Sequence, residues 1–265
     1  MKIILGKNCG FCNGVQYTIN KANEILNNSA NKIYCLGEII HNEDVIKGLE
    51  NKGMVTVTNI NDIPNNETVI FRAHGESAHI YEIAKEKKLK IIDLTCGKVK
   101  LIHNKINKFK DKYFIIIIGK KIHPETIGSK GYADSNSLVI ENIDDLENLE
   151  TKFNKSKLRG IYIIAQTTFN DLLFDEISNK IKEMFKNIEV IIDKTICDAT
   201  YKRQQEVMEL AKKCNKMIII GGINSSNTKE LYLISKKNCS NSYLIQSVND
   251  LQELIFNDND ISCSY

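Results

Sequence analysis

Three cysteines each stand alone in a short turn between an apolar run and a helical pattern. They are Cys12, Cys96 and Cys197. If the turns belong to repeated units, the thiols meet at one point, each at a helix N-terminus, where the helix dipole favours the thiolate. Three thiolates hold a soft metal and leave one position open, which suits a [4Fe–4S] cluster or, less well, a catalytic zinc. A single free cysteine is more often a small buried hydrophobe, so the agreement of three turns is what favours a metal site.

A fourth cysteine adds an alternative. Cys9 and Cys12 form a Cys-x-x-Cys motif, which is typical of thiol–disulfide oxidoreductases and of one half of a zinc site. The sequence contains no second Cys-x-x-Cys. We therefore expect Cys12 to be a ligand and Cys9 to be a bystander.

Hydrogen-bond donors follow other strand-like runs, in loops marked by glycine or proline or at the start of a helical pattern. They are His41, His74, His123, Ser225, Ser226 and Asn227. Imidazole N–H groups, hydroxyls and a helix N-terminus together form a nest that binds an anion. The expected anion is a phosphate or a diphosphate.

A carboxyl group accompanies these donors. Glu125 follows Pro124, whose fixed φ angle holds Glu125 and His123 in one rigid loop. A surface position is the ordinary alternative for a glutamate, but a bound diphosphate and desolvation would raise its pKa and keep it protonated, as a proton donor requires. Thr167 and Thr168, which follow another apolar run, could relay that proton or hold a substrate hydroxyl.

Short β-branched runs alternate with helical patterns along the whole chain, and this alternation is typical of an α/β protein with parallel strands. Helical spacing follows Cys12 and Cys197, and Val248–Leu254 is also expected to be helical. The predicted strands are Lys2–Leu5, Lys32–Leu36, Thr68–Arg72, Lys90–Leu94, Tyr113–Ile118, Ile161–Ala165, Glu189–Asp193, Met217–Ile220 and Ser242–Ile245.

The turns after these strands fall into three classes that recur about every 80 to 100 residues, the size of a small lobe. One class carries cysteine, one carries the donors of His41, His123 and Ser225, and one carries His74 or Thr167. We therefore predict three pseudo-symmetric lobes, each a small parallel sheet with flanking helices, whose loops converge at the carboxyl ends of the strands. The predicted lobes are residues 14–96, residues 97–193, and residues 1–13 with 194–265. The third class has no member in the third lobe, where the repeat predicts a further loop and helix after Tyr265. Either the chain is truncated there or the third lobe is naturally incomplete.

Composition excludes several classes of protein. The 265 residues are 42% hydrophobic and 26% charged, which allows a folded core, and the net charge of +3 is spread along the chain, so nucleic acid is not an expected partner. The longest apolar run, Tyr113–Ile118, is far shorter than the roughly 20 residues of a membrane helix, and no signal-peptide pattern opens the chain. We expect a cytoplasmic protein without a membrane partner, whose cysteines stay reduced. No dinucleotide or Walker A motif is present, so any electrons come from outside.

Eight motifs, in order, resemble the 4-hydroxy-3-methylbut-2-enyl diphosphate reductase family, the last enzyme of the methylerythritol phosphate route to isoprenoids. The resemblance covers nearly the whole chain. The motifs are Gly10-Phe-Cys-Asn-Gly-Val15, Glu38-Ile-Ile-His-Asn42, Ala73-His-Gly75, Asp93-Leu-Thr-Cys96, His123-Pro-Glu125, Gln166-Thr-Thr168, Thr195-Ile-Cys-Asp-Ala-Thr200 and Asn224-Ser-Ser-Asn227.

The resemblance implies a fold, a cofactor and a reaction. A three-lobed α/β protein would hold a [4Fe–4S] cluster through Cys12, Cys96 and Cys197, with one iron open to the hydroxyl of the substrate. Glu125 and Thr167 would deliver protons, and an external donor such as ferredoxin or flavodoxin would supply two electrons. The products would be isopentenyl and dimethylallyl diphosphate. The diphosphate would lie against His41, His74, His123, Ser225, Ser226 and Asn227, and Thr168 is also implied to bind the substrate.

Two features depart from the family pattern. Cys9 stands where relatives usually carry another residue, and the family's Gly-Ala-Ser loop, which gives a serine to the diphosphate site, would come after Tyr265. Two other functions stay open at this point. One is a non-catalytic iron–sulfur or phosphate sensor, against which the intact His-Pro-Glu and Gln-Thr-Thr motifs argue, and the other is a thiol–disulfide oxidoreductase that uses Cys9 and Cys12.

Overall fold

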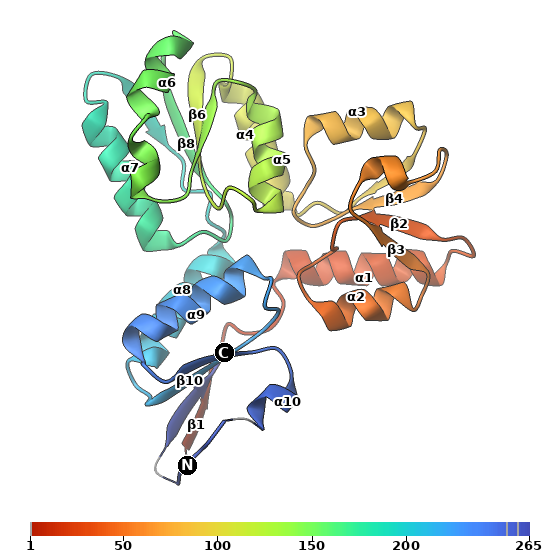
Figure 1. The fold of residues 1–265 in the computed structure, drawn as a ribbon, viewed down its shortest axis with the longest axis vertical. Helices are drawn as coiled ribbons and strands as arrows, with labels where there is room; N and C mark the ends of the chain where they lie inside the picture. The colour runs from red at the N-terminus through yellow and green to blue at the C-terminus, as the bar shows by residue number, and fades with distance from the viewer. Residues whose placement is uncertain (1, 253, 259) are drawn as a thin grey trace.

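The computed structural model describes residues 2–252, 254–258 and 260–265. These residues form three parallel four-stranded sheets, and Figure 1 shows them as three lobes around a common centre. The predicted α/β fold of three lobes is therefore confirmed. The strands are β1 (Lys2–Leu5), β2 (Ile33–Leu36), β3 (Met54–Val57), β4 (Thr68–Phe71), β5 (Lys90–Asp93), β6 (Tyr113–Ile118), β7 (Ser137–Ile140), β8 (Gly160–Ala165), β9 (Glu189–Ile192), β10 (Lys216–Ile220), β11 (Ser242–Ile245) and β12 (Ile261–Ser264).

The three sheets share one strand order. The first sheet runs β3-β2-β4-β5, the second β7-β6-β8-β9 and the third β11-β10-β12-β1. In the third sheet the N-terminal strand β1 takes the fourth place, where Lys2 pairs with Ile261 of β12, and Figure 1 shows β1 in the same lobe as β10. The N-terminal strand thus belongs to the third sheet, as the predicted division of the chain requires. The predicted lobe boundaries stay a prediction, and residues 1, 253 and 259 of the third lobe lie outside the described residues.

Helices connect the strands and cover the sheets. In the second lobe, α4 and α5 pack on one face of the sheet and α6 and α7 on the other, while in the third lobe α8 and α9 cover one face and Ile3 and Leu5 on the other face are exposed. None of the helices in the described part of the chain has the length and apolar character needed to cross a membrane. The helices are α1 (Asn13–Asn27), α2 (Glu43–Glu50), α3 (Ala78–Glu86), α4 (Gly97–Phe109), α5 (Pro124–Ala133), α6 (Leu149–Ser156), α7 (Asp171–Met184), α8 (Asp198–Ala211), α9 (Ser226–Asn238) and α10 (Val248–Leu251), and two 3₁₀ turns span Ile60–Asp62 and Ile143–Leu146.

Three strands were not predicted, one helix ends earlier than predicted, and six strand ends differ from the prediction by one residue. The strands β3, β7 and β12 were not predicted; β3 and β7 are four-residue edge strands with exposed polar neighbours, and β12 contains two serines. Tertiary pairing overrides this weak local signal, because β12 lies between β1 and β10 and buries Cys263. The helix α10 ends at Leu251, before the predicted end at Leu254, and residue 253 lies outside the described residues.

The strand order explains why the turns form three classes. In the spatial order of each sheet, cysteine turns follow the fourth strand (β5, β9 and β1), and the turns with His41, His123 and Ser225 follow the second strand (β2, β6 and β10). The third class follows β4 and β8, and β12 takes the corresponding place in the third sheet. In parallel sheets these turns all lie at the carboxyl ends of the strands, so the topology brings them to one side of each lobe. The predicted loop after Tyr265 stays a prediction.

Candidate active site

Each of the three predicted cysteine ligands occupies the N-cap position of a helix. Cys12 precedes α1, Cys96 precedes α4 and Cys197 precedes α8. The backbone N–H of Thr200 donates to Cys197 Sγ at 3.4 Å, and backbone N–H groups at the start of α4 face Cys96 in the same way. Amide donors at a helix start stabilise a thiolate. The sequence repeat is therefore a structural one: the same helix-start environment surrounds all three thiols.

The three thiols also lie close together. Burial raises the pKa of Cys96, and the neighbouring Cys12 and Cys197 raise it further, because thiolates repel one another. A side chain at Gly14 would place its Cβ 2.8 Å from Cys96 Sγ and 4.0 Å from Cys12 Sγ. Gly14 thus leaves room for sulfur atoms contributed by two different turns. Three partly buried thiols at helix starts are a donor set that fits an iron–sulfur cluster with three protein ligands.

Cys9 takes no part in this arrangement. Its exposed thiol donates to the carbonyl oxygen of Gly6 at 3.2 Å, within its own loop. The structure contains no disulfide among the described cysteines, and Cys9 and Cys12 are both free thiols.

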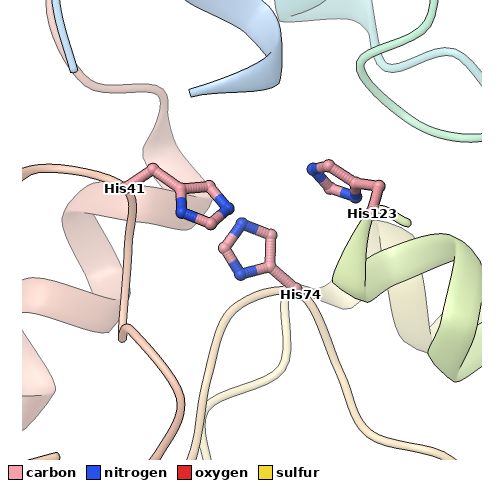
Figure 2. A group of neighbouring side chains, drawn as sticks. All are labelled: His41, His74 and His123. Atoms are coloured by element: carbon pink, nitrogen blue, oxygen red, sulfur yellow. The ribbon is translucent and has the colours of Figure 1, made fainter. Parts of the chain in front are cut away.

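Three histidines from three different turns form a compact group (Figure 2). The ring centroids of His41 and His74 are 4.5 Å apart, those of His74 and His123 are 5.4 Å apart, and those of His41 and His123 are 6.0 Å apart. His41 and His74 come from the first lobe and His123 from the second, where it is the N-cap of α5. The sequence placed His41 and His123 in equivalent turns and His74 in a turn of another class, and the fold brings all three turns into contact. We call them the three-histidine group.

Burial keeps two of these imidazoles neutral. It lowers the pKa of His74 well below its ordinary value and that of His123 to about 3, and the neighbouring histidines lower both further. His41 Nδ1 lies 2.7 Å from Glu38 Oε2, so the carboxylate accepts the Nδ1 proton. His41 Nε2 and His74 Nδ1 are buried and have no hydrogen-bond partner in the protein. Buried polar atoms normally have partners, so these two nitrogens are available to a ligand.

The third lobe closes the site from the opposite side. Ser225 is the N-cap of α9, and its hydroxyl accepts from the backbone N–H of Thr228 at 3.3 Å. Gly222, three residues before Ser225, lies against the carbonyl of His41, so closely that any side chain there would overlap it. Asn227 Oδ1 is buried without a partner in the protein. The third lobe thus contacts the turn of His41 in the first lobe. That Ser225, Ser226 and Asn227 bind the same ligand as the histidines stays a prediction.

A glutamine connects the second and third lobes. Gln166 Nε2 donates to Ser226 Oγ at 3.1 Å and to Thr168 Oγ1 at 2.7 Å, while Gln166 Oε1 accepts from the backbone N–H of Lys120 at 2.9 Å. Gln166 is 2% exposed. Sequence reasoning assigned no role to Gln166 or to Glu38, although both stand in the motifs that carry the candidate ligands. The position of Gln166 next to Thr167, in a turn that faces another lobe, was the signal available.

Glu125 and Thr167 form a buried pair. The backbone N–H of Thr167 donates to Glu125 Oε1 at 2.6 Å, and the Thr167 hydroxyl lies 2.6 Å from Glu125 Oε2. Burial raises the pKa of Glu125 to about 7, although both contacts with Thr167 lower it. The backbone N–H of Glu125 in turn donates to His123 Nδ1 at 3.2 Å. A carboxyl group that is half protonated at neutral pH thus lies beside the three-histidine group.

Known proteins resemble this chain in sequence and in fold. The family model described as "LytB protein" matches residues 3–263. The chain is 42% identical to the 4-hydroxy-3-methylbut-2-enyl diphosphate reductase of Clostridioides difficile over 232 residues, which cover 87% of the chain and 81% of the relative. It is 38% identical to the enzyme of that name from Aquifex aeolicus, over 94% of the chain and 85% of the relative.

Solved structures agree. The E-1-hydroxy-2-methyl-but-2-enyl-4-diphosphate reductase of Plasmodium falciparum superposes with a TM-score of 0.89 at 34% identity, over 99% of this chain and 82% of that chain. A solved (E)-4-hydroxy-3-methyl-but-2-enyl diphosphate reductase, described as the terminal enzyme of the non-mevalonate pathway, superposes with a TM-score of 0.68 at 36% identity, over 100% and 92% of the two chains.

Proposed function

Since this chain belongs to the LytB protein family, whose relatives are reductases, we propose that it converts 4-hydroxy-3-methylbut-2-enyl diphosphate to isopentenyl and dimethylallyl diphosphate. The reaction breaks the allylic C–O bond, consumes two electrons and two protons, and releases water. The observation that carries the proposal is the convergence of three cysteine-capped helix starts with a nest of donors and a buried carboxyl group. Each requirement of the reaction has a candidate group within this site.

The metal centre is proposed to rest on the three N-cap cysteines. Cys12, Cys96 and Cys197 would hold a [4Fe–4S] cluster, and the helix starts would stabilise their thiolates. When bound, the cluster would pass two electrons to the substrate and offer one iron as a Lewis acid to its hydroxyl. The missing side chain at Gly14 keeps space free between Cys12 and Cys96.

The diphosphate is proposed to bind the donors of all three lobes. Two buried groups without protein partners, His41 Nε2 and Asn227 Oδ1, mark where ligand atoms or rotated amide donors would complete the hydrogen bonding. An incoming dianion would also favour the protonated imidazoles and so raise the pKa values that burial has lowered. The proposed ligands are His41, His74, His123, Thr168, Ser225, Ser226 and Asn227.

Glu125 is the proposed proton source, and Thr167 its relay. A pKa of about 7 lets the carboxyl group hold a proton in the resting site and release it to a developing carbanion or hydroxide. The Thr167 N–H fixes one oxygen, so the other oxygen faces the Thr167 hydroxyl at 2.6 Å. A hydroxyl both donates and accepts, which allows the proton to pass through Thr167.

The electrons are proposed to come from a small external carrier, such as a ferredoxin or a flavodoxin, because the sequence carries no nucleotide-cofactor motif. We also propose a cytoplasmic location, where such carriers are present and where thiols stay reduced.

Anaerobic turnover tests the proposal. The chain is reconstituted with iron and sulfide, and oxidation of a reduced viologen dye is followed after 4-hydroxy-3-methylbut-2-enyl diphosphate is added. We expect oxidation that depends on the substrate and is lost in Cys197→Ser. If an intact cluster forms but the dye stays reduced, the reductase proposal fails, and an iron–sulfur or phosphate sensor becomes the favoured function. Substrate-independent thiol exchange through Cys9 and Cys12 would favour the oxidoreductase alternative.

A further inference from the structure

The three-histidine group offers nitrogen lone pairs as well as N–H donors. From its geometry we infer that His41, His74 and His123 bind a divalent late transition-metal ion, such as Zn²⁺, when the diphosphate is absent. The metal site itself does not depend on the reductase reaction. Only its competition with the substrate rests on the proposed function.

The nitrogen atoms are close enough for one ion. One ring nitrogen from each histidine lies within 4.8 Å of the others. A tetrahedral zinc with Zn–N bonds of about 2.0 to 2.1 Å holds its nitrogens roughly 3.4 Å apart, so small side-chain rotations suffice. Figure 2 shows the three rings facing one another across a common space.

The surroundings of His41 are those of a metal ligand. Glu38 Oε2 accepts the Nδ1 proton at 2.7 Å, which leaves the lone pair on Nε2, and Nε2 is buried without a partner. Histidines that bind metals usually donate their other N–H to a carboxylate or carbonyl, which fixes the tautomer and raises the basicity of the ring. His74 presents a second buried nitrogen without a partner, Nδ1.

The protonation states of the histidines also favour metal binding. A metal binds the neutral imidazole, and burial keeps His74 and His123 neutral at physiological pH. Arg72 lies near these rings and opposes a cation, but its Nε donates to Glu76 Oε1 at 3.0 Å, so much of its charge is balanced. Lys120 is a second cation near His123.

His123 is the weakest of the three ligands. Its Nδ1 accepts the backbone N–H of Glu125 at 3.2 Å, so the neutral ring carries its proton on Nε2. A ring bound to a metal keeps its proton on the other nitrogen, so ligation by His123 breaks this long hydrogen bond. The site is therefore expected to depend strongly on His41 and His74 and less on His123.

Metal and diphosphate exclude one another in this arrangement. An imidazole nitrogen that gives its lone pair to a metal cannot donate a proton to a phosphate oxygen. Bound Zn²⁺ would thus be a reversible inhibitor that competes with the substrate, and the diphosphate would displace it.

Calorimetric titration of the anaerobic, cluster-loaded protein with Zn²⁺ tests the inference, because the cluster occupies the cysteines. We expect saturation near one equivalent and a loss of affinity of at least 100-fold in His74→Ala. We expect about tenfold weaker binding in His123→Ala and 10- to 100-fold weaker binding in Glu38→Gln, as for other carboxylates that support a metal-bound histidine. His79→Ala is the matched control, because His79 is 76% exposed at the side chain and pairs with Glu82 outside the group; its affinity should equal that of the wild type.

Competition is measured with inorganic pyrophosphate. At ten times its own Kd, and with free Zn²⁺ set by a metal buffer that accounts for the soluble zinc–pyrophosphate complex, pyrophosphate should raise the apparent Kd for free Zn²⁺ about elevenfold. A Cys12→Ser/Cys96→Ser/Cys197→Ser protein titrated with Co²⁺ gives a second readout: nitrogen ligation produces visible ligand-field bands without sulfur-to-metal charge transfer. Three results would overturn the inference: no saturable Zn²⁺ binding up to about 1 mM, binding that persists in His74→Ala, or binding that pyrophosphate leaves unchanged or tightens. If pyrophosphate binds and Zn²⁺ does not, the metal-site inference fails and the proposed reductase is unaffected. If Zn²⁺ binds but the dye assay shows no turnover, the reductase proposal fails and the metal-site inference stands.

Discussion

Replacing Glu125 by glutamine should make the protein more stable at high pH while it abolishes most of its turnover. Burial raises the pKa of this carboxyl group from its ordinary 4.5 to about 7. The folded state therefore binds the proton more tightly than the unfolded state. This contribution to stability is fully present below pH 4.5 and is lost as the pH rises through 7.

The size of the effect follows from the shift. At about 1.4 kcal/mol per pKa unit, wild-type protein should lose about 3 kcal/mol between pH 4.5 and pH 8 through Glu125 alone. Glutamine is uncharged and has the same shape, and its amide can keep both contacts with Thr167. The difference in unfolding free energy between Glu125→Gln and the wild type should therefore move by about 3 kcal/mol in favour of the variant over this range.

Anaerobic urea unfolding at several pH values measures this difference, and the dye assay measures turnover. The loss of a general acid lowers kcat by about 10² to 10⁴, whereas KM should change little if Glu125 does not bind the diphosphate. Glu82→Gln is the control, because it makes the same substitution at an exposed position outside the site. If the stability gap fails to open with pH, Glu125 is not a buried, protonated acid; if kcat is unchanged, it is not the proton source.

Three further substitutions test the rest of the site. Cys197→Ser should lower the iron content of the reconstituted protein severalfold, as measured by iron analysis, and an unchanged content would remove this residue from the ligands. Gly14→Ala places a Cβ 2.8 Å from Cys96 Sγ and should therefore lower the iron content of the reconstituted protein. Gly97→Ala is the control, because a Cβ there would meet no atom within 4 Å, and it should leave the iron content unchanged. Equal iron contents in the two variants would contradict the close packing at Gly14. Gln166→Ala removes the hydrogen bonds to Ser226 and Thr168, each worth about 1 kcal/mol. The variant should therefore bind pyrophosphate at least tenfold more weakly in calorimetry. An unchanged affinity would show that the Gln166 bridge between the lobes does not support diphosphate binding.

The fold was largely predictable because buried parallel strands are continuous apolar runs. Every residue of Tyr113–Ile118 is buried, and the run is unmistakable in the sequence. The strands that escaped prediction lack this signal: Ser137–Ile140 lies at a sheet edge, and Ile261–Ser264 is buried through its two neighbours rather than its composition. Their existence depends on pairing with distant strands, which no local pattern contains.

The residues of the candidate site could be predicted from the sequence, but the contacts between them could not. The repeat of turns placed Cys12 with Cys96, because equivalent turns of equivalent lobes must face a common axis. The bond from Gln166 to Ser226 joins residues 60 positions apart, and it depends on how two lobes dock. The pairing of Glu38 with His41 spans only three residues, yet in a loop that spacing fixes no geometry, unlike the same spacing on a helix.

The distribution of charge explains why one centre can serve both a metal cluster and an anion. Helices α1, α4, α5, α8 and α9 all begin at the site, so their positive dipole ends gather there, and Arg72, which is paired with Glu76, and Lys120 add positive charge near the histidines. The titratable groups between them are held close to neutral, since burial lowers the pKa of His123 to about 3 and raises that of Glu125 to about 7. Because the buried imidazoles are neutral and Arg72 is paired with Glu76, the site carries little uncompensated charge without a ligand. Thiolates or a diphosphate can then bring negative charge to it, and the imidazoles can take up protons in response, so protonation at this site follows the ligand rather than preceding it.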